Sequence, residues 1–171
     1  MVRDIAGEKL GAKDKPDVFS LRCTVAFFRN DDGKWQYPSN PENKRKVVQQ
    51  GDAWVDESTG KTLDACQRRY VLSLQVMDAT GSAWCTAFDD TAAQLLRRSA
   101  DDLWELSESD PPAAAAAWKA ALFRACVLKV RAKAERYNDE TRVKCSLLSC
   151  EPVNFKAEGR QLLEQIRRYV G

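Results

Sequence analysis

The chain has 171 residues, of which 44% are hydrophobic, enough for one domain with a substantial apolar core. Its formal net charge is only +2 and it contains no histidine, which excludes Ser-His and Cys-His nucleophilic dyads and removes the commonest metal ligand. It has no glycine-rich phosphate loop, no signal peptide and no run of ~20 apolar residues, so nothing indicates an enzyme or a membrane protein.

The first half of the chain predicts three strands and an insert. Residues 1–17 are a polar lead-in, and residues 18–29 alternate as expected for a strand with one apolar face. Residues 30–66 are too long and too polar for an ordinary connection, which predicts a small insert with short strands of its own. Two further strands follow at residues 69–77 and 82–88. The apolar face of the first strand carries Phe19, Leu21, Cys23, Val25 and Phe27.

The second half predicts helices on either side of a hairpin. Residues 91–103 and 112–121 have helical character and are separated by a pair of prolines. Residues 126–147 alternate around a turn, and residues 155–170 form a final helix. This order of elements predicts a mainly β (α+β) fold, namely a five-stranded oligonucleotide-binding (OB) barrel with an insert between strands 1 and 2 and a C-terminal helix.

The hairpin gives the strongest indication of function. Apolar or small side chains alternate with charged ones along both strands, and Asn138-Asp139-Glu140 supplies turn chemistry between them. Cations that follow phosphates and a ring that stacks on a base suit a single-stranded nucleic acid. The alternatives are a solvated strand face and a tyrosine that only packs at the hairpin end. The exposed face carries Lys129, Arg131, Tyr137, Arg142 and Lys144.

The strand at residues 82–88 separates large side chains from small ones. Trp84, Thr86 and Phe88 share one face, whereas the other face is made of alanine and cysteine. Large residues of a half-buried strand normally face the core, and the strand alone favours that interpretation. The alternative places the small residues inward and leaves Trp84 and Phe88 on an open binding face.

Several motifs, spread over almost the whole chain, point to one known family. They are Glu8-Lys9-Leu10-Gly11, Asp14-Lys15-Pro16-Asp17, Trp84-Cys85-Thr86-Ala87-Phe88, Tyr137-Asn138-Asp139-Glu140-Thr141-Arg142-Val143-Lys144, Glu151-Pro152-Val153, and the stretch from Gly159-Arg160 to Ile166-Arg167-Arg168. With these motifs the sequence resembles the C-terminal OB domain of the large subunit of replication protein A, the eukaryotic single-stranded-DNA binder. Met1 is then expected to be an artificial start within a longer subunit.

The resemblance implies an OB barrel with a zinc ribbon between its first two strands. It also implies that the rings of Trp84, Phe88 and Tyr137 lie at the DNA face. The cations Arg142 and Lys144 are implied to lie at the same face. This favours the open-face interpretation of the strand at residues 82–88.

The insert is where the sequence departs from the family. The resemblance puts the four zinc-binding cysteines at Pro38, Asn43, Asp56 and Thr59, and none of these is cysteine. Structural zinc is held almost always by Cys or His, so we expect no metal and no cofactor, with the ribbon kept only as a shape. The six cysteines of the chain are expected to be buried free thiols. A small apolar core is expected in place of the metal, made of Trp35, Tyr37, Trp54 and Leu63.

The final helix carries an apolar stripe at helical spacing. One interpretation packs this stripe against the barrel of the same chain. The resemblance implies instead a three-helix bundle with the middle and small subunits of a heterotrimer. The stripe residues assigned to these partners are Leu162, Leu163, Ile166, Tyr169 and Val170. The expected boundaries are then a lead-in at 1–17, an OB-fold domain at 18–152 with a ribbon-like insert at 30–66, and an oligomerisation helix at 153–171.

The sequence thus predicts a nuclear single-stranded-DNA-binding and subunit-assembly domain of a replication-protein-A-like large subunit, acting in DNA replication, repair and recombination. Binding is expected to be largely independent of sequence, because phosphates meet cations and bases stack on rings. Two alternatives stay open: a scaffold that keeps its C-terminal helix but has negligible DNA affinity, and a telomere-specialised paralogue.

Overall fold

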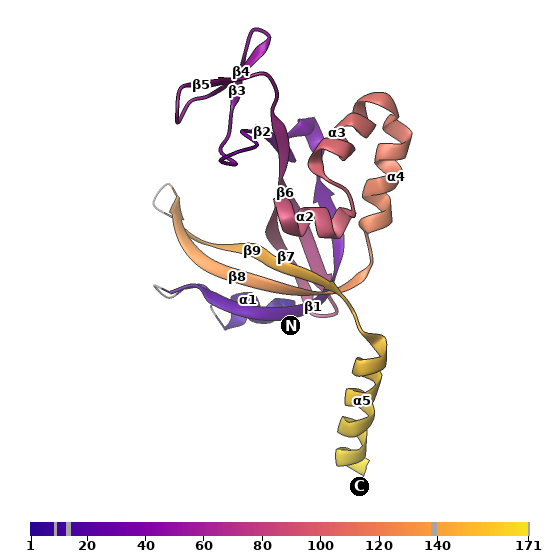
Figure 1. Ribbon diagram of the computed structural model, residues 1–171. Coiled ribbons are helices and arrows are strands. Elements are labelled where there is room, and N and C mark those ends of the chain that lie inside the picture. Colours follow the sequence, from indigo (N-terminus) through magenta and orange to yellow (C-terminus); the bar gives the residue numbers. More distant parts are fainter. Residues whose placement is uncertain (9, 13–14, 138–139, 171) are drawn as a thin grey trace.

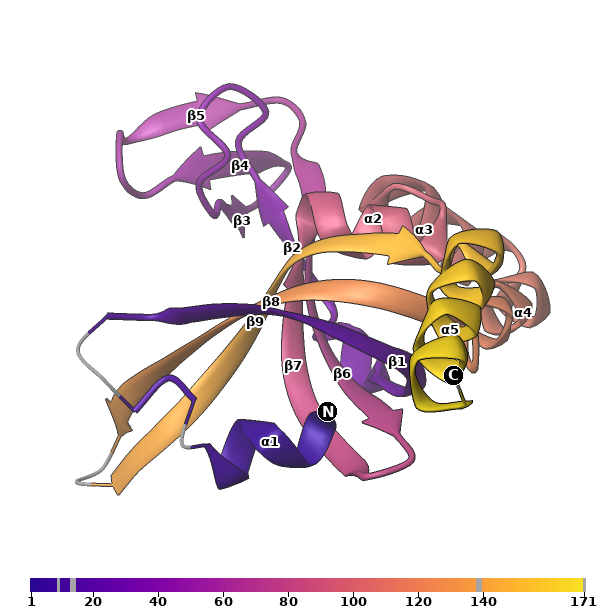
Figure 2. The same ribbon diagram turned by 90° about the horizontal axis from the view of Figure 1, so that it is seen from below.

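The protein is seen here as a computed structural model that describes residues 1–8, 10–12, 15–137 and 140–170, apart from the side chains at positions 6, 7, 32, 136, 137 and 140. A sheet with the order β1-β8-β9-β7-β6 closes on itself because β1 also pairs with β6 (Figure 2). Adjacent barrel strands are antiparallel, except that β7 and β9 run parallel. The expected five-stranded barrel is therefore formed. Its strands are β1 (Asp17–Arg29), β6 (Gln67–Asp78), β7 (Gly81–Phe88), β8 (Ala125–Tyr137) and β9 (Glu140–Pro152).

The barrel forms because its strands alternate apolar and polar side chains, so that one face of each strand fills the interior. In β6, the fully buried residues are Tyr70, Leu72, Leu74 and Val76. Burying a side chain such as Leu or Val stabilises the fold by about 1.5–3 kcal/mol. All six cysteines are free thiols, and Cys23, Cys85, Cys126 and Cys145 are buried among these apolar residues.

The order of inward-facing and outward-facing side chains in β1 differs from the expected alternation. A bulge between Val25 and Phe27 shifts the pairing of β1 with β6, so Val25 faces the interior but Phe27 does not. Phe28 is buried in its place, with its ring 5.4 Å from that of Trp118. The expectation that Phe27 belongs to the apolar face of the strand is therefore wrong.

Three helices lie between β7 and β8, at the end of the barrel seen at the upper right of Figure 1: α2 (Asp89–Leu96), α3 (Ala100–Ser109) and α4 (Pro111–Ala121). The single helix expected over residues 91–103 is broken because Arg97 adopts a left-handed conformation with φ of 55°. Helix α3 then begins at a capping box, in which Ser99 Oγ accepts from the backbone N–H of Asp102 at 3.0 Å.

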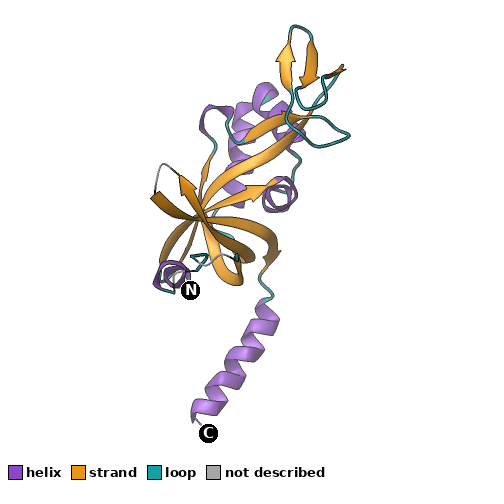
Figure 3. Ribbon diagram, turned by 90° about the vertical axis from the view of Figure 1, so that its left-hand side faces the viewer, coloured by secondary structure: helices purple, strands orange, loops and turns teal. Residues whose placement is uncertain are grey.

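The insert contains a short 3-10 turn, η1 (Asp31–Gly33), and four strands: β2 (Gln36–Ser39), β3 (Val48–Gln50), β4 (Ala53–Asp56) and β5 (Lys61–Leu63). Strand β2 extends the main sheet by pairing with β6, whereas β3, β4 and β5 form a separate sheet. This small sheet stands away from the barrel in both Figures 1 and 3.

The apolar core expected inside the insert is not formed as predicted. The ring of Trp35 lies 5.6 Å from that of Tyr70 and 5.5 Å from that of Trp118, so Trp35 belongs to the main core. Only two of the four expected residues meet, since Trp54 of β4 pairs with Leu63 of β5. The expected core was wrong because residues before β2 fold back against the main sheet.

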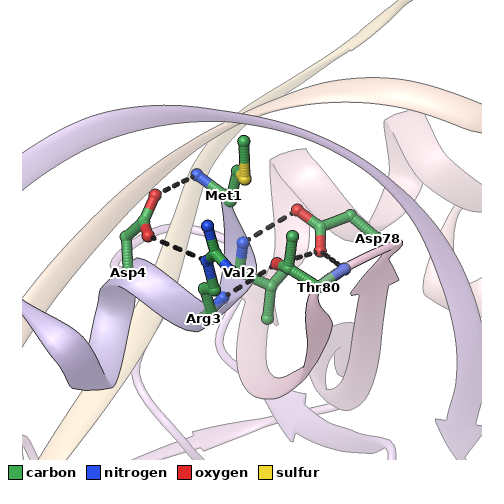
Figure 4. A network of polar contacts seen from close by, with 6 residues as sticks. All are labelled: Met1, Val2, Arg3, Asp4, Asp78 and Thr80. Carbon is green, nitrogen blue, oxygen red and sulfur yellow. Dashed lines mark hydrogen bonds and ion pairs between the residues drawn. The ribbon is translucent and has the colours of Figure 1, made fainter.

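The lead-in contains a helix that the polar composition did not reveal, α1 (Val2–Gly7). Val2 and Ile5 are buried in the main core. The turn between β6 and β7 holds this helix, because Asp78 Oδ2 accepts from the backbone N–H of Val2 at 2.8 Å (Figure 4). Hydrogen bonds from Thr80 and from Val2 lower the pKa of Asp78 to about 2, against the cost of its partial burial.

The C-terminal helix α5 (Phe155–Val170) projects away from the barrel (Figures 1 and 3). Asn154 begins it, with Oδ1 accepting from the backbone N–H of Ala157 at 3.0 Å. An ion pair joins its first turn to β1, with 2.6 Å between Arg22 Nε and Glu158 Oε1. None of the helix residues is buried. Among the described residues, no helix combines the length and hydropathy needed to cross a bilayer.

Candidate nucleic-acid interface

Strand β7 presents its large side chains to solvent. Trp84 and Phe88 are 45% and 46% exposed, whereas Cys85 and Ala87 are buried. The interpretation that places the rings in the core is therefore wrong, and both rings face solvent as the alternative expected; their role in binding stays a prediction. The physical reason is that β7 lies between β6 and β9 on a small closed barrel, whose interior accepts only small side chains from this strand.

Trp84 lies in a groove between β7 and the β8–β9 hairpin. The pairs Cys85–Cys145 and Thr86–Ser146 align β7 with β9, which brings Trp84 beside Lys144. The groove has a volume of about 290 Å³ and includes two of the predicted cations. Its lining consists of Ser73, Trp84, Cys85, Thr86, Glu135, Arg142, Val143, Lys144 and Cys145. The register of the sheet therefore brings one ring and two cations from distant parts of the sequence into one groove.

A carboxylate lies among these cations. Glu135 pairs with Arg142 across the β8–β9 hairpin, and its Oε2 lies 3.6 Å from Lys144 Nζ. Both side chains of this ion pair are about half exposed, so it contributes less than about 1 kcal/mol. The pair places the Lys144 ammonium group beside a carboxylate at the edge of the groove.

Two further residues complete the surface around Trp84, and sequence reasoning missed both. Phe27 is 45% exposed and meets the Trp84 ring edge-on, with 6.2 Å between ring centroids. The guanidinium carbon of Arg29 lies 4.8 Å from the centre of the same ring. The signal that could have revealed them is the adjacent pair Phe27-Phe28, because only one of two neighbouring strand residues can face the interior.

The other predicted residues lie outside the groove. Lys129 and Arg131 are exposed on β8, where Arg131 pairs with Ser146 of β9, so they extend the same outer face by one strand. Phe88 is exposed at the end of β7. The backbone of Tyr137 ends β8, but its side chain lies outside the described residues.

The insert does not fit the zinc that the family resemblance implies. Pro38 has no ligand atom in its side chain and lies in β2, and both oxygens of the Asp56 carboxylate already accept hydrogen bonds. Within the described part of the chain, no three side chains of the His, Cys, Asp and Glu types gather where they could hold a metal ion.

The chain is similar to proteins of one kind. A family model described as the replication factor-A C-terminal domain matches residues 18–162. Replication factor A protein 1 of Schizosaccharomyces pombe is 31% identical over 167 residues, which cover 96% of this chain and 27% of that protein. The replication protein A 70 kDa DNA-binding subunit of Mus musculus is 31% identical over 168 residues, 98% of this chain and 27% of that protein. The chain thus spans about a quarter of the length of these relatives.

Two solved structures share the fold. One, described as a replication protein A heterotrimer bound to ssDNA, matches with a TM-score of 0.90 and 31% identity over 98% of this chain and 39% of that one. The other, described as yeast RPA bound to ssDNA, has a TM-score of 0.85 and 28% identity over 98% of this chain and 95% of that one.

Proposed function

The chain belongs to the replication factor-A C-terminal domain family, and from this premise we propose that it is a single-stranded-DNA-binding and subunit-assembly domain of a replication-protein-A-like large subunit. The observation that carries the proposal is the solvent-facing ring of Trp84 in a groove with Arg142 and Lys144. Membership of this family agrees with the expectation that the chain is not an enzyme.

The groove supports binding that does not depend on sequence. Every base has a face that can stack on Trp84, Phe88 or Tyr137, and every nucleotide has a phosphate that can meet a cation. Arg142 and Lys144 line the same groove as the ring, while Lys129 and Arg131 continue the basic surface along β8. A DNA strand bound in this way would cross the outer face of the barrel from β7 towards β8.

Assembly is proposed for α5. Its stripe faces solvent, from 55% exposure at Ile166 to 92% at Tyr169, so folding of this chain alone does not bury it. A helix with one apolar stripe is stabilised by packing against other helices, as in a bundle. The proposed partners are the middle and small subunits of a heterotrimer, in the nucleus, with roles in DNA replication, repair and recombination.

A scaffold with negligible DNA affinity is the second candidate. Glu135 in the groove favours it, since this carboxylate opposes the approach of phosphates. The two candidates differ in one measurable quantity, the affinity of the isolated chain for an oligonucleotide.

The test is a titration of a labelled oligothymidylate of about 20 nucleotides, longer than the ~4–16 nucleotides that one OB fold covers. We expect binding at low salt that weakens as salt rises, because counterions are released from the phosphates. Binding should also weaken in Trp84→Ala. An absence of binding at low salt would contradict the proposal and favour the scaffold.

A further inference from the structure

The insert contains two turns of the same construction, residues 40–45 and 56–61. In each turn, the side-chain oxygen of the first residue accepts from the backbone N–H two positions later: Asn40 Oδ1 from Glu42 and Asp56 Oδ1 from Ser58, both at 2.9 Å. The carbonyl of the first residue accepts from the backbone N–H four positions later, at 2.8 Å from Lys44 and 2.7 Å from Gly60.

The fifth residue of each turn also has the same unusual backbone. Lys44 has φ of 63° and Gly60 has φ of 71°, both in the left-handed region. A non-glycine residue adopts this conformation at an energetic cost, so the first turn is held by the contacts around it. The two turns are therefore repeats of one backbone motif, although their sequences Asn-Pro-Glu-Asn-Lys-Arg and Asp-Glu-Ser-Thr-Gly-Lys differ.

One carboxylate joins the two turns. Asp56 has no exposed surface, and its Oδ2 accepts from Asn40 Nδ2 at 2.9 Å and from Asn43 Nδ2 at 2.6 Å. Its Oδ1 accepts from the backbone N–H and the hydroxyl of Ser58. Each oxygen of the carboxylate thus accepts two hydrogen bonds, and Oδ2 receives both of its bonds from the other turn.

These contacts correct the correspondence drawn from sequence. Pro38 lies within β2, whereas Asn40 begins the first turn as Asp56 begins the second. The positions that match by geometry are Asn40 and Asn43 in the first turn and Asp56 and Thr59 in the second. Both pairs have the spacing of a Cys-x-x-Cys zinc ribbon, with 12 residues between them.

We propose that the buried Asp56 carboxylate takes the place of a structural metal ion in this insert: it fastens the two turns to each other, and the insert folds without metal. A tetrahedral ion holds two turns through four ligands. Here, a single charged group holds them through four donors, which satisfies the requirement that a buried charge be hydrogen-bonded. This proposal does not depend on the proposed DNA-binding function.

The first test measures amide hydrogen exchange in the full chain at Lys44, Val47 and Gly60, whose N–H groups bond within the insert. In Asp56→Asn, an amide nitrogen would replace one acceptor and leave donors unmatched. Since hydrogen bonds to a charged group are at stake, we expect exchange at these amides to quicken on the order of 10- to 100-fold. Exchange at Leu74 in the barrel should not change.

The matched control is Lys61→Ala. It removes the exposed ion pair between Lys61 Nζ and Glu42 Oε2, 2.9 Å apart, which also links the two turns. We expect little change in exchange, because exposed pairs contribute little. Equal protection in the wild type and in Asp56→Asn would overturn the proposal. So would one equivalent of zinc in the purified chain whose removal by a chelator quickens exchange at the same amides.

A second variant tests whether the two turns have the arrangement of a zinc site, by putting cysteines at the four matching positions. Asn40→Cys, Asn43→Cys, Asp56→Cys and Thr59→Cys, made together, should restore a four-thiolate site. We expect this variant to bind one zinc per chain and to lose protection in the insert when a chelator is added. Failure to bind zinc would show that the two turns are not arranged as proposed.

Discussion

Arg29 stacks its guanidinium on the ring of Trp84, 4.8 Å from the ring centre, although 55 positions separate the two residues in the chain. Phe27 meets the same ring edge-on. The two β1 residues restrict the orientation of this half-exposed ring, so the proposed stacking of a base on it would cost less side-chain freedom. They also place a third cation at the groove.

Replacement of Trp84 by alanine should weaken oligonucleotide binding by about 1–3 kcal/mol, because one stacking platform is lost. Stability should fall by no more than about 1–2 kcal/mol, because the half-exposed ring loses only its contacts with Phe27 and Arg29. Anisotropy titrations and thermal unfolding measure the two effects. Phe123→Ala is a suitable control, because Phe123 is also an exposed ring and lies outside the groove. Unfolding of Trp84→Ala would mean that the ring is structural.

Glu135→Gln should strengthen binding at low salt several-fold, because it removes the negative charge beside Lys144. The gain in affinity over the wild type should shrink as salt rises, because dissolved ions already screen the Glu135 charge in the wild type. The measurement is the dissociation constant over a series of salt concentrations. Glu151→Gln, on the neighbouring strand β9 but outside the groove, should have a smaller effect. Equal gains from both variants would indicate a general effect of net charge and not a local one.

Lys144→Ala should reduce the salt dependence of binding by about 0.7 in the slope of log K against log salt, the contribution of one phosphate contact on a single strand. Arg131→Ala tests whether the bound DNA continues from the groove onto β8. An unchanged slope in Arg131→Ala would limit the DNA path to the groove.

Leu163→Glu with Ile166→Glu should abolish co-purification with the two proposed partner subunits. The barrel should stay folded and bind oligonucleotide as before, because neither side chain is buried. Gln161→Glu with Gln165→Glu adds the same charge outside the apolar stripe and should leave assembly intact. If the Leu163 and Ile166 variant unfolds when alone, the helix stabilises its own domain and the assembly role fails.

Docking of α1 should depend on pH through Asp78. Its pKa is lowered to about 2 in the folded chain, so its contribution to stability is complete above the ordinary value of about 3.9 and is lost as pH falls towards 2. The difference in unfolding free energy between the wild type and Asp78→Asn should therefore be constant from pH 7 to about 5 and should decrease below about pH 4. Denaturant unfolding at each pH measures it. A difference that stays constant down to pH 2 would contradict the assignment.

Sequence periodicity was sufficient for the barrel but not for its irregularities. The alternation in β8 and β9 and the spacing in α5 predict these elements nearly as they are found. The bulge after Val25 and the left-handed Arg97 each change one residue's backbone, and a single residue leaves no periodic signal. Trp35 was misplaced for a different reason, since its partners Tyr70 and Trp118 are 35 and 83 positions away.

The sequence pointed to individual residues of the candidate site but not to how they are brought together. Charge and aromatic character on the hairpin and on β7 identified residues of one face, but only the parallel register of β7 with β9 unites Trp84 with Lys144. In the sequence, Asp56 stood out only as one of the four positions at which the resemblance implies a zinc-binding cysteine. Its hydrogen-bond partners, Asn40, Asn43 and Ser58, are residue types that occur in any loop, so composition did not distinguish them.

The way in which the two turns of the insert are joined also determines how the domain responds to oxidants and to a shortage of zinc. Thiolates that hold zinc are attacked by peroxides and released when the ion is scarce. A carboxylate bound by amides and a hydroxyl has no oxidisable atom and needs nothing from the medium. Its pKa is lowered by the hydrogen bonds from Ser58, Asn43 and Asn40, so it keeps its charge at lower pH than an ordinary carboxylate does. Under oxidative stress or zinc starvation, this insert would keep its shape where a four-cysteine ribbon would open.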